Sequence, residues 1–231
     1  MSRLGTITLM AFHISSAKLT EADIIERLGP HVQEEPRGAV PLEPDSPSSL
    51  ALPRPAAVLM PLIRMPAESG ETDWHILYTR RTDLVKHHKG QVCFPGGRSD
   101  PEDPSPEATA LREAFEEIGL GASHVRILGR MDEFVTITNY LVTPVVGVIP
   151  WPYTFTLEPK EVSRVFTIPM DWLADSNNYE IRQRELPPDF PVPPRFGSLQ
   201  IVRFKPYHGE VLWGATAEAT LRLIERLGMA F

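Results

Sequence analysis

The chain has 231 residues, 42% of them hydrophobic, which suffices for one sizeable folded core, and its formal net charge is −7. The acidic balance, with no long basic run, argues against a protein that binds the phosphate backbone of nucleic acid, and the single cysteine, Cys93, excludes an intramolecular disulfide. No run of 18 or so consecutive apolar residues predicts a membrane span, and the N-terminal apolar run is too short for a secretory signal, so we expect a cytoplasmic protein without a membrane partner.

The first 51 residues are predicted to form an extension ahead of the main domain. Thr20 and Asp23 have the spacing of a capping box, and the amphipathic pattern of residues 22–29 predicts a short helix that ends at Gly29. A proline-rich stretch then predicts a linker that leads into the first strand. We therefore divide the chain into an extension, residues 1–51, and a main domain, residues 52–231.

The main domain is predicted to contain more strands than helices. Apolar and β-branched runs predict strands at residues 56–63, 74–80, 90–94, 125–131, 133–137, 142–149 and 198–207. Amphipathic patterns predict helices at residues 106–119, 170–175 and 215–228. Because several neighbouring strands have no helix between them, an α/β/α sandwich with a mixed central sheet explains this order better than a doubly wound parallel sheet does.

The helix predicted at residues 106–119 carries an unusual group of acids. Its 3.6-residue period predicts that Ala108, Leu111, Phe115 and Ile118 face the core and that three glutamates face solvent on the opposite side. These glutamates are Glu113, Glu116 and Glu117. A Glu-rich helix is usually a solvated surface, but carboxylates at i and i+4 can also converge on one hard cation.

A glycine pair favours the cation site over the solvated surface. Gly96 and Gly97 follow an apolar strand, where the lack of side chains lets the backbone approach a ligand or a metal. With the acidic helix at a fixed distance, the two features resemble the signature of the Nudix hydrolases, which runs from a glycine through an acidic position to Arg-Glu-apolar-any-Glu-Glu-any-Gly-apolar. Its places are occupied by Gly97, Asp103, Arg112, Glu113, Ala114, Glu116, Glu117, Gly119 and Leu120.

This chain departs from the Nudix signature in two ways. Asp103 stands where glutamate is usual, and eight residues rather than seven separate it from Arg112. The departures resemble those of one branch of the family, the coenzyme A pyrophosphatases, whose members carry a further motif before the glycines. Residues 76–97, ILYTRRTDLVKHHKGQVCFPGG, are similar to that motif.

The resemblance implies a metal-dependent diphosphatase with a Nudix-type sandwich fold. Mg²⁺ or Mn²⁺ would be held by Glu113, Glu116, Glu117 and the carbonyl of Gly97, and Arg112 would orient the carboxylates. One helix glutamate or Glu161, which resembles a glutamate kept near the site in this branch, would take the proton from water; Glu161 also fits a solvated loop.

The basic residues ahead of the glycines are the expected contacts for a phosphate-rich small molecule. Arg80, Lys89 and the backbone at Gly96 are the candidates for substrate binding. They belong to the one basic cluster of an acidic chain, which comprises Arg80, Arg81, Lys86, His87, His88 and Lys89.

The branch resemblance implies hydrolysis of coenzyme A or acyl-CoA to 3',5'-ADP and (acyl-)4'-phosphopantetheine. Three alternatives keep the same chemistry on another substrate, namely ADP-ribose, a sugar nucleotide or a dinucleoside polyphosphate. A nucleotide-sensing module without catalysis is a further alternative, which the presence of all three glutamates disfavours. Homodimerisation is left open by the sequence.

Overall fold

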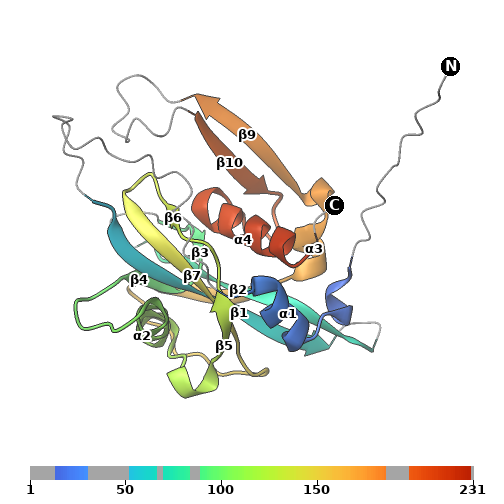
Figure 1. Cartoon of the computed structure of the whole chain (residues 1–231), viewed down its shortest axis with the longest axis horizontal. Helices are drawn as coiled ribbons and strands as arrows, with labels where there is room; N and C mark the ends of the chain where they lie inside the picture. Colours follow the sequence, from blue (N-terminus) through green and yellow to red (C-terminus); the bar gives the residue numbers. More distant parts are fainter. Residues whose placement is uncertain (1–13, 31–51, 67–69, 84–88, 186–197, 230–231) are drawn as a thin grey trace.

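A mixed sheet is the centre of the fold. The computed structural model describes residues 14–30, 52–66, 70–83, 89–185 and 198–229 (Figure 1). The sheet has eight strands, with the main order β3-β2-β1-β7-β5; β4 pairs with β1, β6 with β7 and β8 with β2. The strands are β1 (Arg54–Pro66), β2 (Thr72–Arg81), β3 (Val92–Cys93), β4 (Gly96–Arg98), β5 (Arg126–Arg130), β6 (Phe134–Val135), β7 (Tyr140–Val148) and β8 (Val162–Pro169).

Strands β1 and β7 run parallel, whereas the other strand pairs of this sheet in the described residues are antiparallel. The sequence of β1, RPAAVLMPLIRMP, is a nearly continuous apolar run, as expected for a strand that is buried on both faces. Its side chains alternate between two core clusters: Met60 and Leu62 belong to one, and Leu59 and Ile63 to the other. The predicted mixed sheet is confirmed.

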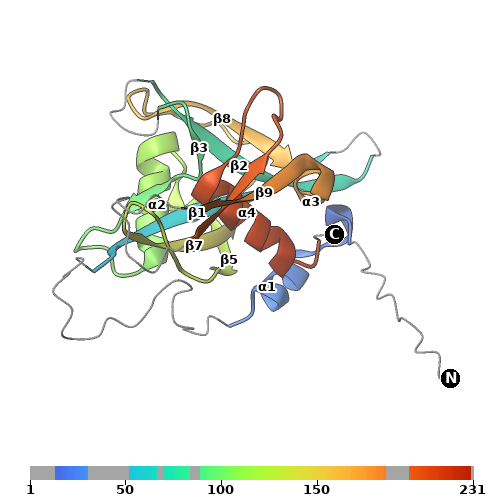
Figure 2. The same cartoon turned by 90° about the horizontal axis from the view of Figure 1, so that it is seen from above.

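Helices cover both faces of the sheet. The four are α1 (Glu21–Leu28), α2 (Pro106–Ile118), α3 (Met170–Ala174) and α4 (Gly214–Arg226). In Figure 1, α2 lies below the sheet, while α4 lies above it together with the hairpin of β9 (Tyr179–Glu185) and β10 (Ser198–Phe204). Figure 2 shows β2 and β8 towards one side of the sheet and β5 and β7 towards the other. Short 3₁₀ turns complete the described part at Ser16–Lys18, Ala122–His124 and Ser176–Asn178.

Helix α1 packs against the sheet through one apolar side. Thr20 and Asp23 form the predicted capping box, and Gly29 ends the helix. Ile24 and Leu28 are buried in the core cluster that includes α4. The linker predicted after α1 lies outside the described residues, and the domain boundary at residue 52 stays a prediction.

Three strands and one helix face differ from the expectations. The sequence did not predict β4, which contains the glycine pair and has no apolar side chain. It did not predict β8 or β9 either, because both carry charged side chains at exposed positions and neither is a continuous apolar run. The predicted core face of α2 was wrong for Phe115, which is 61% exposed. The buried side of α2 instead carries the small residues Ala110 and Ala114, which let the helix lie close to the sheet. The expectation that all three glutamates face solvent was wrong for Glu117, whose side chain is 3% exposed because it is enclosed against the amide of Gly96 and the side chain of Arg81.

Neighbouring isoleucines on α1 provide a test of its role in stability. Ile24 is fully buried and Ile25 is 49% exposed. Ile24→Ala should lower the free energy of unfolding by about 2–5 kcal/mol, because it leaves a cavity in the core. Ile25→Ala should change it by less than about 1 kcal/mol. Urea denaturation measures both free energies of unfolding. If Ile24→Ala lowered the free energy of unfolding as little as Ile25→Ala does, α1 would not unfold together with the sheet.

Candidate active site

Local sequence signals fix both ends of α2. The Oγ of Ser105 caps the first turn by accepting a hydrogen bond from Ala108 N at 3.3 Å, and Pro106 occupies the first turn, where its missing N–H has no consequence. Gly119 ends the helix in the left-handed conformation, with φ 66° and ψ 22°. The cap residues thus set the position of the glutamates along the chain.

The glycine pair allows a close approach between β4 and α2. A Cβ on Gly97 would lie 2.5 Å from the Cδ of Glu113, so the Glu113 carboxylate occupies the space that any larger residue would fill. Gly96 has a φ of 154°, and a Cβ there would collide with the backbone of β1 at Ala57 and Val58. The backbone therefore requires glycine at position 96, whereas a side chain at position 97 would displace the carboxylate of Glu113.

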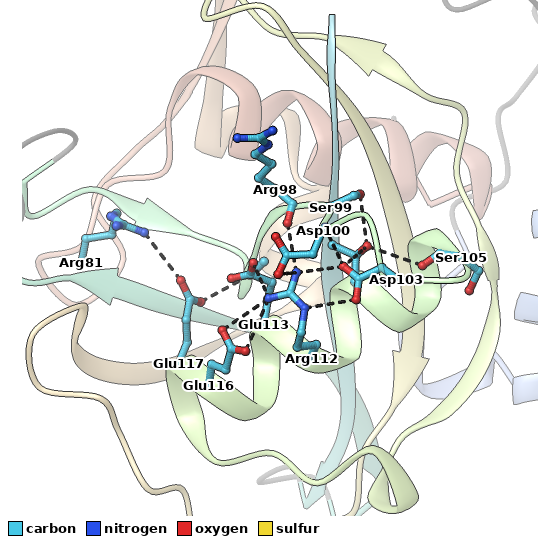
Figure 3. Close-up of polar contacts among 12 residues, drawn as sticks. Arg81, Arg98, Ser99, Asp100, Asp103, Ser105, Arg112, Glu113, Glu116 and Glu117 are labelled. Atoms are coloured by element: carbon cyan, nitrogen blue, oxygen red, sulfur yellow. Dashed lines mark hydrogen bonds and ion pairs between the residues drawn. The ribbon is translucent and has the colours of Figure 1, made fainter.

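Arg112 is held by a network of oxygen acceptors (Figure 3). Asp103 accepts two hydrogen bonds from its guanidinium, from Nε at 3.1 Å and from Nη2 at 2.9 Å, and the carbonyl of Arg98 accepts a third at 3.0 Å. Nη1 donates to Glu113 Oε1 at 2.9 Å and lies 3.4 Å from Glu116 Oε2. These contacts hold the pKa of Asp103 well below its ordinary value and raise that of Arg112. The guanidinium thus has a fixed orientation from which it positions Glu113.

Glu117 is the most enclosed carboxylate of the group. Its side chain is 3% exposed; Oε2 accepts a hydrogen bond from Gly96 N at 3.3 Å, and Oε1 lies 3.6 Å from Arg81 Nη1. Burial raises the pKa of Glu117 to about 8. The effect of burial is therefore larger than that of Arg81 and the Gly96 amide, which both lower this pKa. Burial also raises the pKa of Glu113. The exposed Glu116 completes the set at the solvent side.

The other predicted site residues lie in separate surroundings. Glu161 is exposed, immediately before β8, and its backbone carbonyl accepts a hydrogen bond from Thr82 N at 2.9 Å. The pKa values of Glu113 and Glu117 are raised mainly by burial, and the charge of Glu161 adds a smaller increase to both. Glu161 is therefore close to both carboxylates. Lys89 is exposed in the turn before β3.

Arg80 points away from the carboxylates and pairs with Glu210 at 3.1 Å. Lys86, His87 and His88 lie outside the described residues. Two residues near the carboxylates were not assigned from the sequence: Arg81, the partner of Glu117, and Asp103, the anchor of Arg112. The acidic place in the signature pointed to Asp103, whereas no motif distinguished Arg81 from the basic residues around it.

The donor set suits a hard divalent cation. Carboxylate and carbonyl oxygens are the ligands that Mg²⁺ and Mn²⁺ prefer. Glu117 holds its proton more tightly than usual because its charged form lacks full compensation, and a cation at this place would favour that charged form. In the described part of the chain, no three acidic, histidine or cysteine side chains already converge as a complete ligand set. Glu113 is paired with Arg112 instead, so cation binding would require this side chain to shift.

The fold and the site together define a hydrolase of the Nudix type, in which a strand-glycine-helix unit presents carboxylates beside a mixed sheet. Residues 53–190 match the family model described as NUDIX domain, and the chain belongs to this family. Nudix hydrolases act on small molecules, generally with divalent metal ions such as Mg²⁺ or Mn²⁺, and the match supports pyrophosphohydrolase activity for this chain.

Curated relatives agree with the family. A protein of Photorhabdus laumondii named Nudix hydrolase NudL is 34% identical over 174 residues, which cover 75% of this chain and 85% of the relative. A Yersinia pestis protein of the same name is 35% identical over 176 residues, 76% of this chain and 81% of that one. The crystal structure of a Nudix hydrolase from M. smegmatis, RenU, matches with a TM-score of 0.43 and 21% identity, over 62% of this chain and 78% of that one.

The comparisons do not name coenzyme A, and they support the hydrolase class only.

Within the described residues, no helix is long and apolar enough to cross a membrane.

The enclosed Glu117 carboxylate predicts a pH-dependent stability in the presence of chelator. Its pKa is about 8 in the folded protein, against an ordinary value of 4.5, so the folded state binds more protons than the unfolded state between these values. The free energy of unfolding should therefore fall, by roughly a few kcal/mol, as the pH rises from the ordinary pKa of the carboxyl group to the pKa in the folded protein.

Glu117→Gln should remove most of this slope, because the amide does not titrate. Glu116→Gln, a change at a 57% exposed carboxylate on the same helix, should keep the wild-type slope. Urea denaturation at pH values from 5.5 to 8.5 measures the difference. Parallel slopes for wild type and Glu117→Gln would contradict the assignment.

Proposed function

We propose that this Nudix hydrolase cleaves the diphosphate bond of coenzyme A or acyl-CoA, giving 3',5'-ADP and (acyl-)4'-phosphopantetheine. The observation that carries the proposal is the similarity of residues 76–97 to the coenzyme A pyrophosphatase motif. The position of its described residues supports the proposal, since residues 76–81 lie on β2 and residues 92–97 form β3 and the glycine pair beside Glu113. A motif in that place adjoins the carboxylates and is suited to select the substrate.

Glu113, Glu116, Glu117 and the carbonyl of Gly97 would hold Mg²⁺ or Mn²⁺. When bound, the cation neutralises charge on phosphate oxygens and lowers the pKa of a coordinated water. Hydrolysis of a phosphoanhydride otherwise requires positioning and charge stabilisation more than covalent chemistry from the protein.

The side chains that surround the carboxylates supply this positioning. Arg112, fixed by Asp103, orients Glu113, while the Gly96 amide and Arg81 orient Glu117. Carboxylates oriented in this way would hold the cation in a defined place, from which it would stabilise the charge that develops on the phosphate oxygens.

Proton removal from the attacking water falls to a carboxylate near the helix, and we propose Glu161 for this role. Its exposure lets it reach solvent, and its charge acts on both Glu113 and Glu117. Water then forms a bond to one phosphorus, the bridging P–O bond breaks, and the second phosphate leaves with the bridging oxygen. A helix glutamate is the alternative base.

Mass spectrometry of the products identifies the substrate. Wild-type protein is incubated in parallel with CoA, ADP-ribose and a dinucleoside polyphosphate, each with Mg²⁺, with Mn²⁺ and with chelator. We expect 3',5'-ADP and 4'-phosphopantetheine from CoA, in the metal-containing reactions only. Turnover of another compound with CoA left intact would overturn the proposed substrate and retain the hydrolase class.

Substitution of Glu117 tests the role of the carboxylates. Glu117→Gln should lower kcat by at least about 100-fold, since the amide removes a charged ligand, while circular dichroism should show an unchanged fold. Glu102→Gln, at an exposed glutamate of the loop before α2, is the matched control and should retain wild-type kcat. Wild-type turnover by Glu117→Gln would contradict the metal-ligand assignment.

A further inference from the structure

A second charged cluster lies on the opposite face of the sheet from Glu117. It consists of Arg80 on β2, Arg164 on β8 and Glu210 in the segment between β10 and α4, and we call it the Arg80–Arg164–Glu210 cluster. The same oxygen of Glu210, Oε1, lies 3.1 Å from Arg80 Nη1 and 3.0 Å from Arg164 Nη2. Three segments that are distant in sequence therefore meet at one carboxylate.

Strand pairing places the two arginines side by side. Arg80 and Arg164 are direct partners in the antiparallel β2–β8 pair, and directly opposed side chains project from the same face. Like charges at such positions repel each other. The side chain of Glu210, which is 5% exposed, offsets this repulsion. One carboxylate shared between two guanidiniums leaves a positive charge unbalanced.

The two guanidiniums are also accessible to a ligand. The side chain of Arg80 is 40% exposed and that of Arg164 is 47% exposed. Each guanidinium has five N–H donors, of which the Glu210 contact uses few. Arg164 also lies 5.2 Å from the centre of the Phe166 ring, which restricts its orientation. Two preorganised guanidiniums suit a phosphate, whose oxygens match their planar donor arrangement.

The turn that contains Gly90 closes in on Arg80. A Cβ on Gly90 would lie 3.5 Å from Arg80 Nη2 and 3.4 Å from Asp83 Oδ1. Asp83 and Lys89 lie at this turn and carry opposite charges. Their formal charges sum to zero, so the cluster keeps its unbalanced positive charge. The turn therefore forms a border to the cluster.

The cluster and the carboxylate site are joined through consecutive residues of β2. Arg80 reaches Glu210 on one face of the sheet, and Arg81 reaches Glu117 on the other. Their Cα atoms are about 3.8 Å apart, as in any trans peptide. A single ligand that reaches both positions has to pass around this end of the strand, with its diphosphate on the Glu117 side of the sheet and its separate phosphate group on the Glu210 side.

We infer that Arg80 and Arg164 bind a phosphomonoester of the substrate that is distinct from the diphosphate cleaved. Glu210 holds the two guanidiniums in place for this contact. The inference rests on the proposed function for the identity of this phosphomonoester. If the substrate is coenzyme A, the phosphomonoester is the 3'-phosphate of the adenosine. Arg164 and Glu210 are therefore part of substrate selection, together with Arg80 of the upstream motif.

Kinetics with two substrates test the assignment. Wild type, Arg164→Gln and Arg182→Gln are compared on CoA and on dephospho-CoA, which lacks the 3'-phosphate. In Arg164→Gln the ratio of kcat/KM for CoA to that for dephospho-CoA should fall about tenfold or more, because a charge-assisted contact is lost. Arg182→Gln removes an exposed arginine of β9 and should keep the wild-type ratio. An unchanged ratio in Arg164→Gln would overturn the inference.

A binding measurement separates this inference from the proposed function, since it requires no turnover. Calorimetric titration compares 3',5'-ADP with 5'-AMP. We expect wild type to bind 3',5'-ADP more tightly, with a loss of about tenfold in Arg164→Gln and partial recovery in Arg164→Lys, which keeps the charge. This result would support the phosphomonoester site whether or not the protein hydrolyses CoA. Equal affinities of wild type for the two nucleotides would overturn the phosphomonoester site, also in a protein that hydrolyses CoA.

Discussion

Burial of the Glu117 carboxylate is the constraint on which the site depends. Removing an ionised group from water is unfavourable unless other charges and donors compensate, and here one amide and one arginine do so only in part. The rest of α2 is arranged around this carboxylate. Ala110 and Ala114 bring the helix close to the sheet, and Gly97 leaves room for Glu113 beside it. The result is a site in which the charged forms of Glu113 and Glu117 lack full compensation, which a bound cation would supply.

The arginines have different tasks in this arrangement. Arg112 is fixed by Asp103 and presents a constant orientation to its neighbours, so it acts as a structural element of the site. Arg81 lies 3.6 Å from Glu117 but does not return the pKa of Glu117 to the ordinary range. Arg80 turns to the other face of the sheet. The basic run in the sequence thus divides between two separate surroundings.

The sequence was sufficient for the framework of the fold because its signals were local. Ser105, Pro106 and Gly119 define the ends of α2 through hydrogen bonding and backbone conformation, and the apolar run of β1 indicates a strand buried on both faces. The face of α2 was mistaken because the prediction favoured the bulky Phe115, whereas close packing selected alanines.

Contacts between distant segments could not be read from the sequence. Strand β8 is polar at several positions, and its pairing with β2 alone brings Arg164 opposite Arg80. Glu210 lies beyond the matched family region and approaches only through the packing of the C-terminal segment. The motifs that predicted the carboxylates contain no information on these partners, because side-chain burial depends on the whole fold.

The alternation of β2 links its two neighbouring arginines in a further way. Successive residues of a strand face opposite sides of a sheet, so the insertion or deletion of one residue upstream in β2 that shifted its register would exchange the surroundings of Arg80 and Arg81. Neither arginine could then keep its present partner. Variation of chain length in this strand should therefore be tolerated much less during evolution than variation in the turn that follows it.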